Sequence, residues 1–187
     1  MKEKELNGIL SGNGPVKADT METDILSDVI NEFGLTRKDA NAMPALVLAY
    51  LGDCIYELVI RSLLVERGLS HVSELNKAAV GYVKASAQCG MFRAVERELD
   101  EEETAVFKRG RNVKSSSCPK NASVTDYHTA TGYEALLGYL YAKGRTGRLL
   151  YLVRRGIESS ESGSGQKAPE RMIKKDDHFK KETDIKA

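Results

Sequence analysis

The sequence predicts an all-α fold, and three observations carry that prediction. First, no segment of the 187 residues alternates apolar and polar side chains as a half-buried strand does. Second, residues 44–68 and 127–144 are long apolar segments with helical spacing. Third, Pro44 suits a helix start, and Gly68 and Gly144 suit residues just past helix ends. We expect the two apolar segments to pair at the centre of a helical bundle.

The chain is long enough for one domain of ordinary size with extra residues at both ends. We predict a partly disordered N-terminal extension over residues 1–42, a folded domain over 43–158 and a disordered charged tail over 159–187. A short helix from Thr23 to Gly34 is expected within the extension. The net charge of +1 is unevenly spread, because the predicted domain holds 16 basic and 13 acidic residues and the extension is acidic. This balance alone does not demonstrate nucleic-acid binding, so clustering of basic residues has to support it.

The cysteines and the start of the chain bear on the cellular compartment. Cys54, Cys89 and Cys118 have no paired or metal-like spacing, which is typical of a reducing compartment. We expect Cys54 and Cys89 to be small packing residues. The first residues lack an apolar signal core, and the acids within 44–68 argue against a membrane span. The prediction is a cytoplasmic protein with no membrane association.

The segment 44–68 is the predicted central helix, and it poses a chemical question. It is long enough for about six turns at ~3.6 residues per turn. Its apolar side chains cover so much of the circumference that we expect it to be buried on more than one side. Asp53 and Glu57 nevertheless lie one turn apart within it. A buried carboxylate costs several kcal/mol unless a partner, hydrogen bonds or a cation compensates it, so Asp53 needs an explanation.

A further helix is expected after the central one, with Ser70 or Ser73 as its N-cap. Lys77, Lys84 and Gln88 would lie on or near one polar face of that helix. The ordinary interpretation is a solvated helix face. The alternative, a binding face, depends on what lies opposite.

A basic segment follows the next predicted helix. Asp100 and Glu103 form a capping-box pattern that opens a helix to about Arg109. Gly110 and the small polar residues after it predict a long loop. Basic and amide side chains on a loop suit phosphates and sugar edges, although an ordinary flexible loop is the alternative. Residues 105–125 contain no acid and five basic residues, which are Lys108, Arg109, Arg111, Lys114 and Lys120.

The second apolar segment, 127–144, is the other predicted core helix. Thr125 or Asp126 is its expected N-cap. Glu134 is the only acid in the segment, as Asp53 and Glu57 are the only acids in the middle of the first. A last helix is expected over about 146–157.

Two carboxylates on paired helices could share a cation. Mg²⁺ prefers oxygen ligands, is often held by one or two carboxylates, and activates water near a phosphodiester. If packing brings Asp53 and Glu134 together, they fit that role, but buried acids also serve as structural hydrogen-bond acceptors. The sequence contains no HExxH pattern, no G-x-S-x-G elbow and no Walker loop. His128 is either a substrate contact or an ordinary helix-surface histidine.

Three motifs in order resemble a known family. They are LAYLGDCIYE at 48–57, KRGRNVKSSSCPKN at 108–121 and ATGYEALLGYLY at 130–141. They closely resemble Mini-III ribonuclease, the short bacterial member of the ribonuclease III family that lacks a double-stranded-RNA-binding domain. The resemblance covers roughly residues 43–158, and the RGRN loop is characteristic of Mini-III within the wider family.

The resemblance implies a ribonuclease III-type homodimer that cleaves double-stranded RNA with Mg²⁺, or Mn²⁺ in its place. It implies 5′-phosphate and 3′-hydroxyl ends, and a role in maturing both ends of 23S ribosomal RNA from its precursor. Asp53 matches the aspartate of the family's LGD motif and Glu134 the glutamate of its second acidic motif, so both would be catalytic metal ligands. The side chains expected on the RNA are Lys84, Gln88, Lys108, Arg109, Arg111, Asn112, Lys114 and Lys120.

The chain departs from the general ribonuclease III pattern at two positions. Ala49 stands where the family usually has a glutamate, and Thr131 where it usually has an aspartate; Mini-III shares both losses. Fewer carboxylates should hold fewer or weaker metals, so the ion count stays open. Glu57 is expected to be structural or interfacial. A rival interpretation is a non-catalytic RNA-binding or ribosome-assembly protein on this fold, and a third, a helical protein-interaction module, leaves the basic loop unexplained.

Overall fold

The computed structural model describes residues 25–113 and 123–164, and in that part of the chain every regular element is a helix. The prediction of an all-α fold is therefore confirmed. The N-terminal unit, Met1–Leu35, contributes one short helix to the described residues. The helices are α1 (Ile25–Glu32), α2 (Ala45–Glu66), α3 (Val72–Val83), α4 (Ala85–Val95), α5 (Glu101–Arg111), α6 (Val124–Ala142) and α7 (Thr146–Ser164), with short 3-10 helices η1 (Ala40–Ala42) and η2 (Glu96–Glu98).

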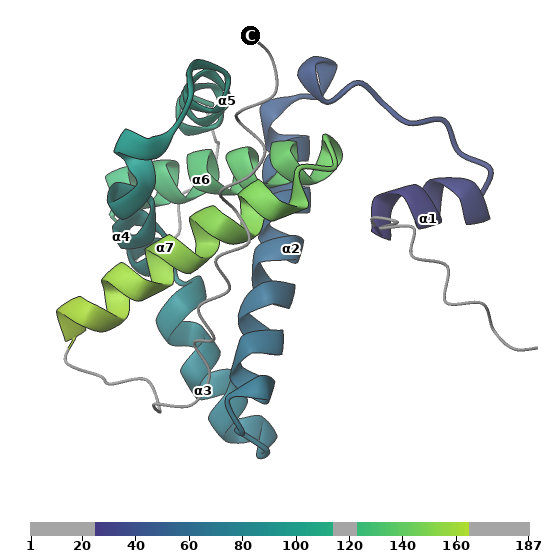
Figure 1. The fold of residues 1–187 in the computed structure, drawn as a ribbon. Helices are drawn as coiled ribbons and strands as arrows, with labels where there is room; N and C mark the ends of the chain where they lie inside the picture. The colour runs from purple at the N-terminus through teal and green to yellow at the C-terminus, as the bar shows by residue number, and fades with distance from the viewer. Residues whose placement is uncertain (1–24, 114–122, 165–187) are drawn as a thin grey trace, which may run out of the picture. The chain divides into compact units, whose positions relative to one another are not determined.

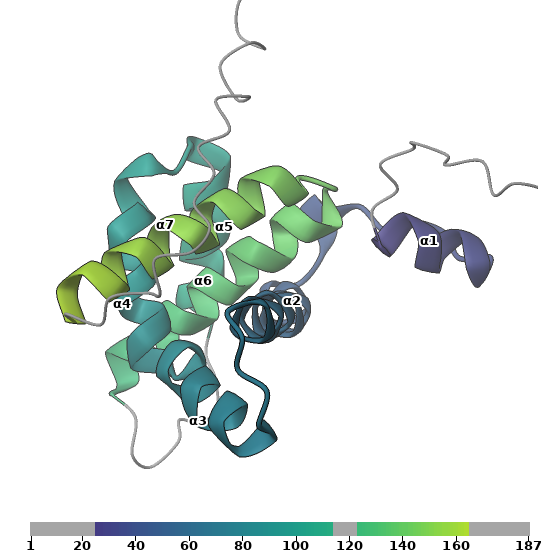
Figure 2. The ribbon, with the colours of Figure 1, turned by 60° about the horizontal axis from the view of Figure 1, so that its bottom comes forward.

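Helix α6 is the centre of the unit Thr36–Ala187. It packs against α2, α4, α5 and α7, and most of its side chains are buried. Figure 1 shows the long helix α2 beside α6, and Figure 2, in which α2 is seen nearly end-on, shows α7 next to α6. Since both apolar segments of the sequence became core helices in contact, their expected pairing is confirmed.

Glycines set the distance between α2 and α6 where the two helices cross. A Cβ on Gly52 would lie 1.8 Å from the backbone oxygen of Glu134, and a Cβ on Gly138 would lie 1.9 Å from that of Leu48. Real Cβ atoms do not approach this closely, so only glycine permits the crossing. The helix backbones are therefore in direct contact.

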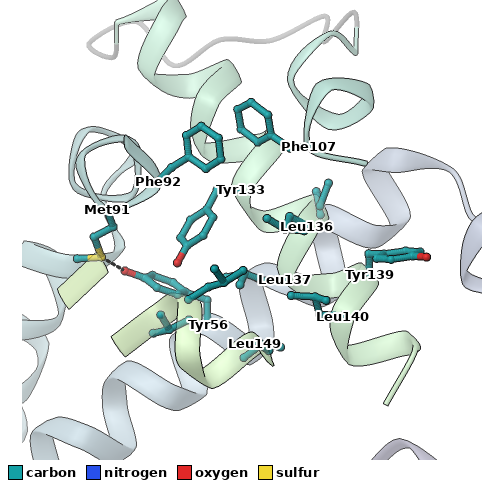
Figure 3. Packing of buried hydrophobic residues seen from close by; sticks show 14 of the residues in the cluster. Tyr56, Met91, Phe92, Phe107, Tyr133, Leu136, Leu137, Tyr139, Leu140 and Leu149 are labelled. Carbon is teal, nitrogen blue, oxygen red and sulfur yellow. Dashed lines mark hydrogen bonds between the residues drawn. The ribbon is translucent and has the colours of Figure 1, made fainter. Parts of the chain in front are cut away.

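Aromatic and aliphatic side chains fill the space around α6 (Figure 3). Phe92 and Phe107 stack with their ring centroids 3.7 Å apart, which joins α4 to α5. The Tyr56 hydroxyl donates to the Tyr82 backbone oxygen at 2.9 Å and contacts the Met91 sulfur at 3.0 Å. The Tyr133 hydroxyl is buried and has no hydrogen-bond partner among the described residues.

The capping box predicted for α5 is present. The Glu103 N–H donates to Asp100 Oδ1 at 2.7 Å, and the Asp100 N–H donates to Glu103 Oε2 at 3.2 Å. The Glu103 carboxylate is fully buried, and Arg148 donates to its two oxygens at 2.8 and 2.9 Å. A buried carboxylate without a partner would destabilise the fold, so this pair fixes the start of α5 against α7.

Other helix boundaries differ from the predictions. The helix expected to run through Gln88 is two helices, because Lys84 has extended backbone (φ −64°, ψ 146°) between α3 and α4. His71, not Ser70 or Ser73, is the N-cap of α3, and Ser123 caps α6, so the cap assignments were wrong. The N-cap residue depends on where the preceding loop joins the helix. Neighbouring Ser, Thr and Asp residues are equally good N-cap candidates in a local pattern.

The surface of α2 also corrects the sequence analysis. Cys89 is buried as expected, but Cys54 is exposed, so its prediction as a packing residue was wrong for the single chain. The expectation that α2 is buried on more than one side agrees with its contacts to α6, α3 and α5. Several large apolar side chains of α2 are nevertheless exposed. They are Leu46, Val47, Tyr50, Leu58 and Val65. Within the described ranges, no helix is both long enough and apolar enough to cross a membrane.

Candidate active site

The crossing of α2 and α6 brings the two acids singled out in the sequence into one place. Asp53 directly follows Gly52, whose Cα faces the backbone of Glu134. The carboxylates are close enough for the charge of Asp53 to raise the pKa of Glu134. The site therefore contains an acid from each of the two central helices.

Glu134 is the more deeply placed of the two acids. Burial is the main cause that raises the pKa of Glu134 to about 7, and the nearby charge of Asp53 adds to the effect. A carboxyl group in this state binds a proton near neutral pH unless a cation takes its place. Glu134 thus has the electrostatic character expected of a functional carboxylate.

Asp53 lies at the solvent-facing end of the pair. We expected a buried carboxylate, but its side chain is exposed, so that expectation was wrong. Neighbouring atoms still desolvate the carboxyl group enough to raise its pKa, and the charge of Glu57 raises it further. An exposed acid beside a half-buried one leaves the site open to a substrate on one side.

Glu57 forms an ion pair with Arg61 on the same helix. The Arg61 guanidinium donates to Glu57 Oε2 at 2.6 and 3.0 Å, one turn along α2. This ion pair agrees with the expected structural or interfacial role of Glu57. His128 lies in the first half of α6, with its ring centroid 5.7 Å from that of Tyr127, and has no assigned role.

Gln88 lies inside the protein, although the sequence analysis placed it with the RNA-contacting residues. Its side chain is 1% exposed, and neither of its polar atoms makes a hydrogen bond of standard geometry within the described residues. It faces Glu134 closely enough to lower the pKa of that carboxyl group. Burial leaves it no surface with which to contact RNA in this conformation.

The basic residues that were expected on RNA and that the structure describes lie at helix ends and are exposed. Lys84 separates α3 from α4, and Lys108, Arg109 and Arg111 belong to the last turn of α5. Asn112 is the C-cap of α5 and accepts a hydrogen bond from Arg111 Nε at 3.3 Å. Lys114 and Lys120, also expected on RNA, lie outside the described residues.

Gly110 fixes this basic helix end against α6. We expected Gly110 in a loop, but it is a buried residue of α5. A Cβ on it would lie 2.6 Å from Ala135 Cβ and 3.1 Å from the backbone oxygen of Thr131. Because these residues flank Glu134 in α6, the packing holds the basic end of α5 within about a turn of the acidic site. The sequence signal for this close packing is Gly110 itself, a glycine between Arg109 and Arg111 at the end of a helical segment.

The donor set fits a magnesium ion with an incomplete protein shell. In the described part of the chain, no group of three or more His, Cys, Asp or Glu side chains is placed to hold a metal. Mg²⁺ needs fewer protein ligands than that, since one or two carboxylates, water and substrate phosphate complete its octahedron. Asp53 and Glu134 supply two carboxylates, and the carboxamide of Gln88, which has no hydrogen-bond partner of standard geometry among the described residues, lies near the carboxylate of Glu134.

Comparisons with known proteins cover this whole site. A family model for the ribonuclease III domain matches residues 46–145. Mini-ribonuclease 3 of Clostridium tetani is 42% identical over 130 residues, which are 69% of this chain and 86% of that protein. Mini-ribonuclease 3 of Brevibacillus brevis is 45% identical over 130 residues, 70% of this chain and 96% of that protein. The fold is similar to that in an X-ray crystal structure of a protein from Fusobacterium nucleatum, with a TM-score of 0.58 and 31% sequence identity. The match covers 65% of this chain and 97% of that one.

Proposed function

Because this chain belongs to the ribonuclease III family, within its Mini-III branch, and is therefore an endoribonuclease, we propose that it cleaves double-stranded RNA with magnesium bound by Asp53 and Glu134. The observation that best supports this proposal is the α2–α6 crossing, which places the two acids together and raises the pKa of Glu134 to about 7. Membership of the family sets aside the rival interpretation of a non-catalytic RNA-binding protein.

Each acid has a distinct part in the proposed reaction. A bound Mg²⁺, or Mn²⁺ in its place, lowers the pKa of water and stabilises negative charge on a phosphodiester. Glu134 would hold the cation from the buried side, where low solvation strengthens the attraction between the carboxylate and the ion. Asp53 would hold it from the exposed side, where the RNA backbone arrives.

RNA binding is proposed for the basic end of α5 and the segment that follows it. Arg111 and Lys108 are exposed there, and Gly110 holds them near Glu134. Duplex RNA is recognised mainly through its backbone and shape, which basic side chains around an acidic site suit. Lys84, Arg109, Asn112, Lys114 and Lys120 are proposed as further contacts.

The natural substrate is proposed to be the precursor of 23S ribosomal RNA, cut at both ends in the cytoplasm. The support for this step is the resemblance to Mini-III alone. The first experiment incubates the purified protein with a long RNA duplex, the same single strand, duplex DNA and a stem from a 23S precursor. Only the RNA duplexes should be cleaved, leaving 5′-phosphate ends, and EDTA should stop the reaction. Equal cleavage of single strands, or cleavage in EDTA, would contradict the proposal.

A homodimer is proposed as the active form. Cutting both strands of a duplex requires two sites, and a two-fold dimer supplies them. The exposed apolar side chains of α2 lie on the helix that carries Asp53; Tyr50, for example, is 73% exposed. A stable dimer buries apolar side chains of this kind at the centre of its interface.

Leu58→Lys should break that dimer. Leu58 is 50% exposed on α2, and burying a lysine charge at an interface costs several kcal/mol, so we expect dimerisation to weaken by about 100-fold or more. Sedimentation velocity over a range of protein concentrations measures this change. The control is Leu150→Lys on α7, where the leucine is 45% exposed and the dimer should persist. A monomeric wild-type protein at high concentration would disprove the homodimer, and a dimer unaffected by Leu58→Lys would place the interface elsewhere.

A further inference from the structure

The buried carboxamide of Gln88 destabilises the fold, and local packing does not explain why the residue is there. Its carboxamide is 1% exposed, and neither Oε1 nor Nε2 has a hydrogen-bond partner of standard geometry among the described residues. Leaving a buried polar group unsatisfied destabilises the folded state, and native structures keep few such groups. An apolar side chain of the same size would avoid this cost.

The position of Gln88 is well defined by its helix. Its backbone N–H donates to the Lys84 backbone oxygen at 3.1 Å, which places it in the first turn of α4. The next residue, Cys89, is 2% exposed, and α4 packs directly on α6. The side chain of Gln88 therefore has little freedom to move away from α6.

The group that Gln88 faces is Glu134. The contact lowers the pKa of the Glu134 carboxyl group, as an N–H directed at a carboxylate does. The contact has not closed into a hydrogen bond of standard geometry. A small reorientation of the carboxylate on binding a cation would allow the bond to form, since ligand carboxylates are commonly held by hydrogen bonds from a neighbouring group.

We propose that Gln88 is a positioning residue, whose carboxamide N–H holds the Glu134 carboxylate in the orientation that binds the divalent cation. This inference rests on the proposed function, in which Glu134 is a metal ligand. It replaces the expectation that Gln88 contacts RNA, because its side chain is buried. Its partner is the carboxylate, so its effect should be on cation affinity and not on RNA affinity.

Gln88→Met separates a positioning role from a structural one. Methionine keeps the length and volume of glutamine but has no N–H donor. We expect the affinity for Mn²⁺, measured directly by electron paramagnetic resonance without RNA, to fall about 10- to 100-fold. The melting temperature in EDTA should stay the same or rise, because an unsatisfied carboxamide is removed. Affinity for duplex RNA in EDTA should not change.

Tyr133→Phe is the matched control. It removes another buried polar group without a partner among the described residues, next to Glu134 in the sequence. The Tyr133 ring lies against Tyr56 and Phe92, with centroids 6.1 and 6.0 Å apart, in the apolar core (Figure 3). We expect Mn²⁺ affinity equal to that of the wild type.

The outcomes distinguish this inference from the proposed function. Wild-type protein that binds no Mn²⁺, or Glu134→Gln protein that binds it normally, would overturn the metal site itself. Loss of Mn²⁺ by Glu134→Gln with normal binding by Gln88→Met would overturn the role of Gln88 alone. A Gln88→Met protein that loses RNA affinity instead would show that Gln88 acts on RNA. If the methionine variant does not fold, the same measurements are made on Gln88→Leu.

Discussion

Asp53→Asn should abolish cleavage of duplex RNA while leaving RNA affinity within about twofold. Asparagine has the shape of aspartate but no charge, so the variant loses one of the two proposed carboxylate ligands. Metal-assisted charge stabilisation is worth several kcal/mol, so we expect the single-turnover rate to fall by roughly 10³-fold or more. Because Asp53 is exposed, the fold should be unaffected. Single-turnover cleavage in Mg²⁺ and duplex binding in EDTA measure the two effects.

The control for Asp53→Asn is Glu57→Gln, one turn further along α2. It also removes a negative charge, but from a carboxylate that is paired with Arg61 at 2.6 Å. We expect its cleavage rate to stay within a few-fold of the wild type, because exposed ion pairs contribute little. Cleavage by Asp53→Asn within tenfold of the wild-type rate would remove Asp53 from the catalytic role. Loss of RNA affinity in that variant would place Asp53 on the RNA instead.

Gly138→Ala should lower the free energy of unfolding by about 3 kcal/mol or more. The added Cβ would lie 1.9 Å from the backbone oxygen of Leu48 and 2.9 Å from the backbone nitrogen of Gly52. Neither backbone atom can rotate away, so α2 and α6 must separate. Overpacking a core typically lowers the free energy of unfolding by about 1–3 kcal/mol. Because the clash is with backbone, we expect a loss at or above the upper end of that range. Urea unfolding at a fixed protein concentration measures the change, since a dimer would make stability depend on concentration.

Gly90→Ala is the matched control for this change. Gly90 lies within α4, and nothing lies within 4 Å of the position that its Cβ would take. Alanine in an open helix position should stabilise the protein by roughly 0.5–1 kcal/mol. Cleavage by Gly138→Ala should also fall under conditions where the variant is folded, because the separation of the helices moves Asp53 away from Glu134. Equal stability of the two variants would show that the crossing tolerates a side chain.

Much of the secondary structure followed from local patterns. Gly68 and Gly144 follow the helices that they were expected to end. Both have a positive φ, 92° at Gly68 and 70° at Gly144. The capping box at Asp100 was also predicted, because its two hydrogen bonds join residues three apart. The division at Lys84 was not predicted, since nothing in the surrounding pattern ends a helix there.

The sequence by itself determined the fold class, the two core helices and the family resemblance, because these depend on apolar periodicity, on glycine and capping residues, and on motif order. It also drew attention to Asp53 and Glu134, since an acid within an apolar helix is unusual at any register. Only the tertiary structure decided which of the two is exposed, that Gln88 is buried against Glu134, and that Gly52 and Gly138 form the crossing. Each of these depends on which face of one helix meets which face of another, and that choice involves contacts between residues far apart in the chain.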